Sequence, residues 1–69
     1  MTVVIKYESH GYTAYNENME VLGRCSYVIH EDSYYNSIED SWTCNRVNLL
    51  GWLKDSLRNK YGNITFKED

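Results

Sequence analysis

Two acidic doublets are the residues of this chain with the clearest capacity for chemistry. Glu31-Asp32 and Glu39-Asp40 lie close together in the sequence. Paired carboxylates can hold Mg²⁺ or Ca²⁺, or carry out acid–base catalysis. Their spacing does not match an EF-hand loop and the stretch contains no glycine, so a metal site is the weaker interpretation. A solvated acidic loop without a role and an acidic surface that faces a partner are equally weighted alternatives.

The histidines and cysteines lack the spacing of known metal or catalytic motifs. His10 and His30 are unpaired in the sequence, and Cys25 and Cys44 form no CxxC motif. A cysteine nucleophile would need a nearby histidine, yet Cys25 and His30 fall on opposite faces of one predicted strand. The chain also has no glycine-rich phosphate loop and no hydrolase motif. We therefore predict a protein that is not an enzyme and that uses no cofactor or metal.

Aromatic side chains are mixed with these acids. The segment from Cys25 to Cys44 contains no lysine and no arginine, but it contains three tyrosines and a tryptophan, namely Tyr27, Tyr34, Tyr35 and Trp42. Tyrosine is common at interfaces because it combines a large ring with a polar tip. Any single tyrosine is explained as well by its preference for strands. Taken together, the segment predicts a surface that repels phosphate and attracts a basic partner.

Size and charge limit the function further. The chain has 69 residues, which we assign to one domain (1–69), and its net charge is −3. Residues 1–45 carry seven acidic and two basic side chains, whereas residues 46–69 carry three acidic and five basic side chains. So small a domain has little core from which to form a deep substrate pocket. The negative charge disfavours direct nucleic-acid binding, although Arg46, Lys54 and Arg58 on a predicted helix are basic.

The cellular location is predicted from hydropathy. No apolar run approaches the roughly 18 residues that span a membrane, and residues 1–6 do not resemble a signal peptide. We expect a cytoplasmic protein, in which Cys25 and Cys44 remain reduced rather than forming a disulfide.

Alternating hydrophobicity predicts a small antiparallel sheet. Residues 2–15 read as a hairpin with a turn at His10-Gly11, and residues 21–29 as a third strand with a bulge near Gly23. Residues 63–67 read as a short final strand. Residues 32–45 are ambiguous, because serine, asparagine and aspartate favour a loop; a helical turn over 37–40 or a short strand over 41–44 are the alternatives. We detect no internal repeat.

One amphipathic helix is predicted over residues 46–60. Leu50, Leu53 and Leu57 recur at helical spacing, with Asn45 or Thr43 as N-cap and Gly62 as C-cap. Trp52 falls on the opposite side of this helix, where it is either an interaction residue or covered by residues 32–45. The predicted fold is α+β: a three-stranded antiparallel meander plus a short C-terminal strand, with the helix packed on one face.

These observations predict a small acidic protein-binding module. We expect a non-enzymatic inhibitor of a basic or nucleic-acid-handling protein, of the phage or mobile-element type that includes anti-CRISPR and anti-defence proteins, in which carboxylates mimic phosphates. The alternatives are a self-associating structural module that forms a homodimer and a small metal- or thiol-dependent enzyme. The predicted partner-binding residues are Glu31, Asp32, Tyr34, Tyr35, Glu39, Asp40, Trp42 and Trp52.

Overall fold

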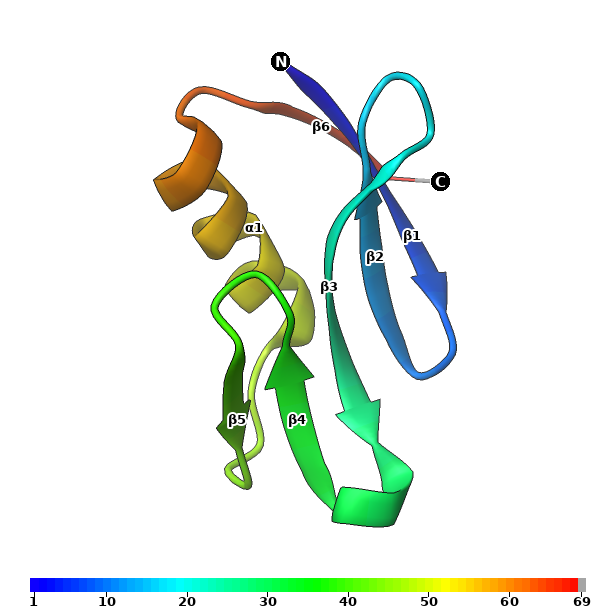
Figure 1. Cartoon of the computed structure of the whole chain (residues 1–69), viewed down its shortest axis with the longest axis vertical. Helices are drawn as coiled ribbons and strands as arrows, with labels where there is room; N and C mark the ends of the chain where they lie inside the picture. The colour runs from blue at the N-terminus through cyan, green and yellow to red at the C-terminus, as the bar shows by residue number, and fades with distance from the viewer. Residues whose placement is uncertain (69) are drawn as a thin grey trace.

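The computed structural model describes residues 1–68, which form a six-stranded sheet with one helix on one of its faces (Figure 1). The α+β class is therefore confirmed. The strands are β1 (Thr2–Glu8), β2 (Gly11–Tyr15), β3 (Val21–Val28), β4 (Ser33–Asn36), β5 (Ser41–Thr43) and β6 (Thr65–Glu68), the helix is α1 (Leu49–Tyr61), and a single 3₁₀ turn, η1 (Ile29–Glu31), joins β3 to β4.

The sheet is mixed, and it has more strands than predicted. Strands β1 to β5 form an antiparallel meander, and the full order is β5-β4-β3-β2-β1-β6. The chain then crosses the sheet through α1 from one edge to the other, so β6 pairs with β1 in parallel, with Thr2 opposite Thr65. The prediction of a three-stranded meander in an antiparallel sheet is wrong, because the ambiguous residues 32–45 contain both β4 and β5.

The core lies between α1 and the middle of the sheet. It consists of six buried apolar side chains from β1, β2, β3 and α1, namely Val3, Ile5, Ala14, Cys25, Leu53 and Leu57. Alternation along the strands points these residues to one face, as the sequence pattern predicted. The predicted apolar face of the helix is thus confirmed, with Leu53 and Leu57 buried and Leu50 packed against them.

The helix begins later than predicted. It starts at Leu49 after Asn48, whose side chain accepts a hydrogen bond from the Gly51 N–H at 3.1 Å. Because Asn48 satisfies a free N–H group of the first turn, the predicted start at Arg46 is wrong by three residues. The predicted C-cap is confirmed: Gly62 has φ of 85° and its N–H bonds to the Arg58 carbonyl.

A bulge interrupts the pairing of β2 with β3, as predicted near Gly23. Ala14 pairs with Gly23, whereas Tyr15 pairs with Val21, which leaves Leu22 as the extra residue. A Cβ atom at Gly23 would lie 2.2 Å from Cγ1 of Ile38. The glycine therefore allows the β4–β5 turn to close over β3.

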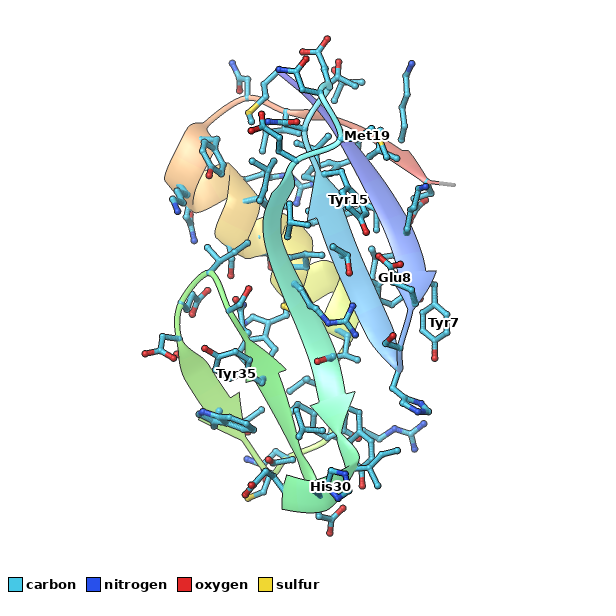
Figure 2. The ribbon with its side chains drawn as sticks, turned by 45° about the vertical axis from the view of Figure 1, so that its right-hand side comes forward. Tyr7, Glu8, Tyr15, Met19, His30 and Tyr35 are labelled. Atoms are coloured by element: carbon cyan, nitrogen blue, oxygen red, sulfur yellow. The ribbon has the colours of Figure 1, made fainter. Side chains whose placement is uncertain are left out.

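The face of the sheet opposite α1 carries polar side chains, and we call it the open face. In Figure 2, Tyr15 and Glu8 lie side by side on this face, and the Tyr15 hydroxyl donates a hydrogen bond to the Glu8 carboxylate. Arg24 donates to Thr13 Oγ1 at 2.6 Å, and also to the Glu8 and Ser9 carbonyls. Polar groups on the β1–β3 half of the open face are thus engaged with one another. Within residues 1–68, no helix is both long and apolar enough to cross a bilayer.

Candidate functional site

An eight-residue repeat holds seven of the eight predicted binding residues. Residues 27–34 read YVIHEDSY and residues 35–42 read YNSIEDSW, so each unit has the pattern Tyr-x-x-x-Glu-Asp-Ser-aromatic. The expectation that the chain has no internal repeat is therefore wrong. An alignment of the first acidic doublet on the second would have revealed the repeat.

The first unit forms the hairpin between β3 and β4. Tyr27 lies opposite Tyr34 across the strand pair, and their ring centroids are 5.1 Å apart. The Tyr27 hydroxyl donates a hydrogen bond to Asp32 Oδ1 at 2.5 Å, which raises the pKa of Tyr27. Asp32 has φ of 47°, a left-handed conformation that aspartate tolerates better than most residues. We call Tyr27, Asp32 and Tyr34 the first cluster.

The second unit forms the hairpin between β4 and β5 in the same way. Tyr35 lies opposite Trp42, with ring centroids 4.5 Å apart. The Tyr35 hydroxyl donates to Asp40 Oδ1 at 2.6 Å, which raises the pKa of Tyr35, and Asp40 has φ of 52°. We call Tyr35, Asp40 and Trp42 the second cluster. Each repeat is therefore one hairpin with one cross-strand ring pair and one tyrosine–aspartate bond.

The two clusters lie on opposite faces of the sheet. Tyr34 and Tyr35 are neighbours in β4, and successive side chains of a strand point to opposite sides. The second cluster belongs to the open face, where Figure 2 shows Tyr35. The first cluster lies on the face that carries α1, outside the group of side chains that pack against the core.

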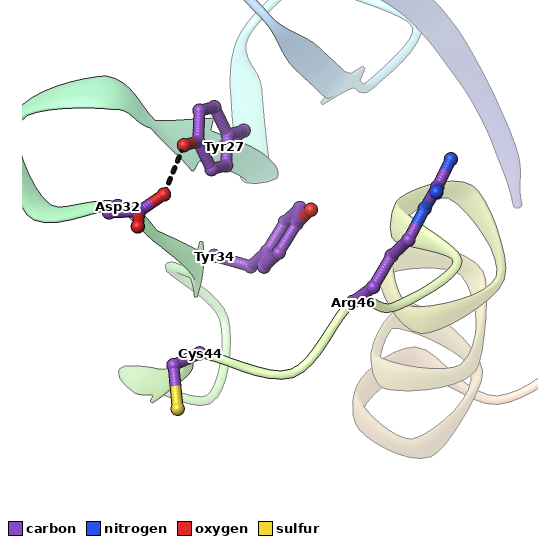
Figure 3. Close-up of a pocket in the computed structure, with 5 residues that line it drawn as sticks. All are labelled: Tyr27, Asp32, Tyr34, Cys44 and Arg46. Carbon is purple, nitrogen blue, oxygen red and sulfur yellow. Dashed lines mark hydrogen bonds between the residues drawn. The ribbon is translucent and has the colours of Figure 1, made fainter.

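An open hollow of about 360 Å³ adjoins the first cluster. It is lined by the first cluster together with Cys44 and Arg46, which follow β5 (Figure 3). Asp32 and Arg46 stand on opposite sides of Tyr34 in this view. Arg46 is exposed and has no hydrogen bond or ion pair with any other residue in 1–68. The hollow thus presents one carboxylate, one unpaired guanidinium and two aromatic rings.

The second cluster is the more accessible one. Trp42 is 54% exposed although its ring packs on Tyr35. Asp40 is exposed beside this ring pair. The two repeats contain no lysine and no arginine. The arrangement offers an aromatic surface with a fixed negative charge at its border.

The acidic doublets do not form one continuous patch. Glu31 and Asp32 precede β4, whereas Glu39 and Asp40 follow it, so the doublets occupy opposite ends of that strand. Glu39 also has a structural partner, because its carboxylate accepts a hydrogen bond from the hydroxyl of Ser56 in α1. Only part of the predicted acidic surface is therefore available to a ligand on either face.

Trp52, the eighth predicted residue, lies away from both clusters. It is half-buried and packs against the core rather than standing free on a polar face of α1. The expectation that Trp52 stands on the side of the helix opposite the leucines, as an interaction residue, is therefore not met. Its contribution is thus to packing.

The remaining groups with chemical potential are separated. Cys25 is buried, and desolvation raises its pKa to about 12, whereas Cys44 is exposed; both thiols are free. His10 and His30 are exposed, in the β1–β2 turn and in η1. Among residues 1–68, no group of three or more His, Cys, Asp or Glu side chains is placed to hold a metal ion.

Comparison with known proteins gives no relative from which to transfer a function. No family model, no curated protein and no solved structure matches the chain.

Proposed function

We propose that the protein is a non-enzymatic binding module that holds a basic segment of another protein, with the second cluster as the principal contact. The observation that carries this proposal is the exposed Trp42 ring, packed on Tyr35 beside the Asp40 carboxylate. A guanidinium group can stack on an aromatic ring while it pairs with a carboxylate. The second cluster provides both interactions at one place.

The rigidity of the second cluster supports the same function. Tyr35 is held from two sides, by its ring contact with Trp42 and by its hydroxyl bond to Asp40. A receptor that is already ordered loses less side-chain entropy when it binds. The cluster can therefore contribute to affinity without first being assembled by the ligand.

The charge of the repeats supports a basic protein surface as the partner. The two units contain four carboxylates and no lysine or arginine. Such a surface repels phosphate and attracts cations. A surface of this kind suits an inhibitor that covers the basic residues with which its target meets nucleic acid. We therefore include nucleic-acid-handling proteins in the proposal as the target class.

The test is a titration of the ¹⁵N-labelled protein with acetyl-tetra-arginine-amide at low salt, followed by NMR amide shifts. We compare the wild type with Trp42→Ala and Asp40→Asn. An exposed cation–π contact contributes ~0.5–1 kcal/mol, so Trp42→Ala should bind about two- to fivefold more weakly. An exposed ion pair contributes ~0.2–1 kcal/mol, so Asp40→Asn should bind more weakly by up to about fivefold. Acetyl-tetra-glutamate-amide should produce no shifts in the second cluster.

The matched control is Asp55→Asn. Asp55 is an exposed carboxylate of α1, paired with Arg58 at 3.2 Å, and its neutralisation changes the net charge by the same amount. We expect Asp55→Asn to leave the affinity nearly unchanged. Equal weakening by Asp55→Asn and Asp40→Asn would mean that only long-range charge attracts the peptide, and the proposal would then be abandoned.

A further inference from the structure

The hollow beside the first cluster holds two opposite charges that are not paired with each other. Asp32 and Arg46 are both exposed, and neither forms an ion pair with any residue in 1–68. Figure 3 shows the Tyr34 ring between them, with the Arg46 side chain extending away from Cys44. Opposite charges that share one hollow without meeting leave room for a ligand that pairs with both.

The Asp32 side of the hollow suits a guanidinium group. Oδ1 of Asp32 accepts the hydrogen bond from the Tyr27 hydroxyl, whereas the other carboxylate oxygen has no partner among residues 1–68. The rings of Tyr27 and Tyr34 line the same hollow, with their centroids 5.1 Å apart. A guanidinium can pair with a carboxylate while its plane stacks on an aromatic ring. Because the Tyr27 bond already holds Asp32, little order has to be imposed by the ligand.

The Arg46 side of the hollow suits a carboxylate. A guanidinium can donate two parallel hydrogen bonds to the two oxygens of a carboxylate. The hydroxyl of Tyr34 has no hydrogen-bond partner within the described residues, and in Figure 3 it is turned toward the Arg46 side of the ring. A carboxylate on this side thus finds a charged donor and a neutral one.

We propose that this hollow binds the carboxyl-terminal arginine of another polypeptide. The guanidinium of that arginine pairs with Asp32 and stacks on the tyrosine rings, while its terminal carboxylate pairs with Arg46. An arginine at a chain end carries both groups in one residue, separated by its flexible side chain. The volume of the hollow, about 360 Å³, lies within the range of ligand sites.

The charge of the hollow favours a chain end over free arginine. In free arginine an α-ammonium group stands next to the carboxylate and would face the Arg46 guanidinium, and like charges oppose association. In a polypeptide the same nitrogen belongs to a neutral amide. The open side of the hollow leaves room for the preceding residues of the partner. The site lies on the face opposite the second cluster, so it is a further contact and does not depend on the proposed function.

Three tripeptides test the inference by NMR titration of the ¹⁵N-labelled protein, followed at the amides of residues 32–34 and 44–46. The first is acetyl-Ala-Ala-Arg with a free carboxylate, and the second is its carboxyl-terminal amide. The third is acetyl-Ala-Ala-citrulline with a free carboxylate, in which a neutral urea replaces the guanidinium. We expect the first peptide to bind about two- to fivefold more tightly than the amide and at least about threefold more tightly than the citrulline peptide.

Two variants assign the two ends of the ligand. Arg46→Gln should remove the advantage of the free carboxylate over the amide, whereas Lys67→Gln, which removes the same charge from β6, should preserve it. Asp32→Asn should remove the advantage of arginine over citrulline, and Asp55→Asn on α1 should preserve it. Asparagine tolerates the left-handed conformation of residue 32, so the hairpin is retained in the Asp32 variant.

Equal affinity of the free acid and the amide would overturn the inference, and so would a carboxylate advantage that survives in Arg46→Gln. Tighter binding of free L-arginine than of acetyl-Ala-Ala-Arg would identify a free amino acid as the occupant and overturn the chain end. Amide shifts confined to the second cluster would overturn the hollow as the site. Acetyl-tetra-arginine-amide has no carboxylate, so its titration decides the proposed function separately.

Discussion

Asn36 is the residue whose replacement most directly tests how the repeats are held to the domain. It is fully buried at the end of β4, and its Nδ2 donates to Ser56 Oγ of α1 at 2.9 Å. Its Oδ1 accepts hydrogen bonds from the N–H groups of Ile38 and Glu39 in the β4–β5 turn. One amide therefore joins the helix to the turn that presents Asp40.

Replacing Asn36 by alanine removes these three hydrogen bonds at once. Each contributes ~0.5–1.5 kcal/mol net, so the free energy of unfolding should fall by about 3 kcal/mol. A domain of this length has a total stability of roughly 3–10 kcal/mol, so the loss is a large part of it. Ser56→Ala is milder and should cost about 1–2 kcal/mol, because it leaves the Asn36 amide without its partner.

Urea unfolding, followed by far-UV circular dichroism, measures both variants and the double mutant. Since the two side chains share one bond, the double mutant should lose about 1 kcal/mol less than the sum of the single losses. Asn59→Ala is the control, because Asn59 is an exposed asparagine of α1. A loss below about 1 kcal/mol in Asn36→Ala, or full additivity, would refute this account of the turn.

Two further predictions concern titration and reactivity. The Asp40 carboxylate raises the pKa of Tyr35, so their bond stabilises the fold below the ordinary phenol pKa of about 10 and is lost as pH rises through the higher folded value. Asp40→Asn should therefore lower the pKa of Tyr35 in an ultraviolet titration near 295 nm, and an unchanged profile would contradict the bond. A thiol reagent should modify Cys44 rapidly in the native protein but Cys25 only after unfolding, because burial raises the pKa of Cys25 to about 12; Cys44→Ser should abolish the native reaction.

The elements that could be predicted from the sequence are those whose apolar face is buried in the core. Val3 and Ile5 alternate with outward residues, and Leu53 and Leu57 recur at helical spacing, because α1 and the sheet bury both sets. Strands β4 and β5 have no such pattern. They are stabilised by cross-strand ring pairs and by tyrosine–aspartate bonds, and the aspartates, serines and asparagine between the rings favour a loop when the sequence is read locally.

The segment that contains the candidate site was predicted from the sequence, but the arrangement of its side chains in space was not. The acidic and aromatic composition indicated residues 31–42, yet the division between two faces depends on strand register, which local composition does not contain. The partner of Glu39 is Ser56, on an element distant in the sequence. This contact can be inferred only when the position of α1 on the sheet is known.

The parallel pairing of β6 with β1 has a consequence for the order of folding. Thr2 meets Thr65, so this pairing joins the two ends of the chain and closes a loop of almost its whole length. Closing a long loop costs more entropy than closing a hairpin, and such contacts form slowly. The two repeats need only adjacent hairpins, so the ring pairs can assemble early and independently of the final strand. Substitutions that disrupt the pairing of β6 with β1 should then lower the global stability, while residual structure persists in the half of the sheet formed by β3 to β5.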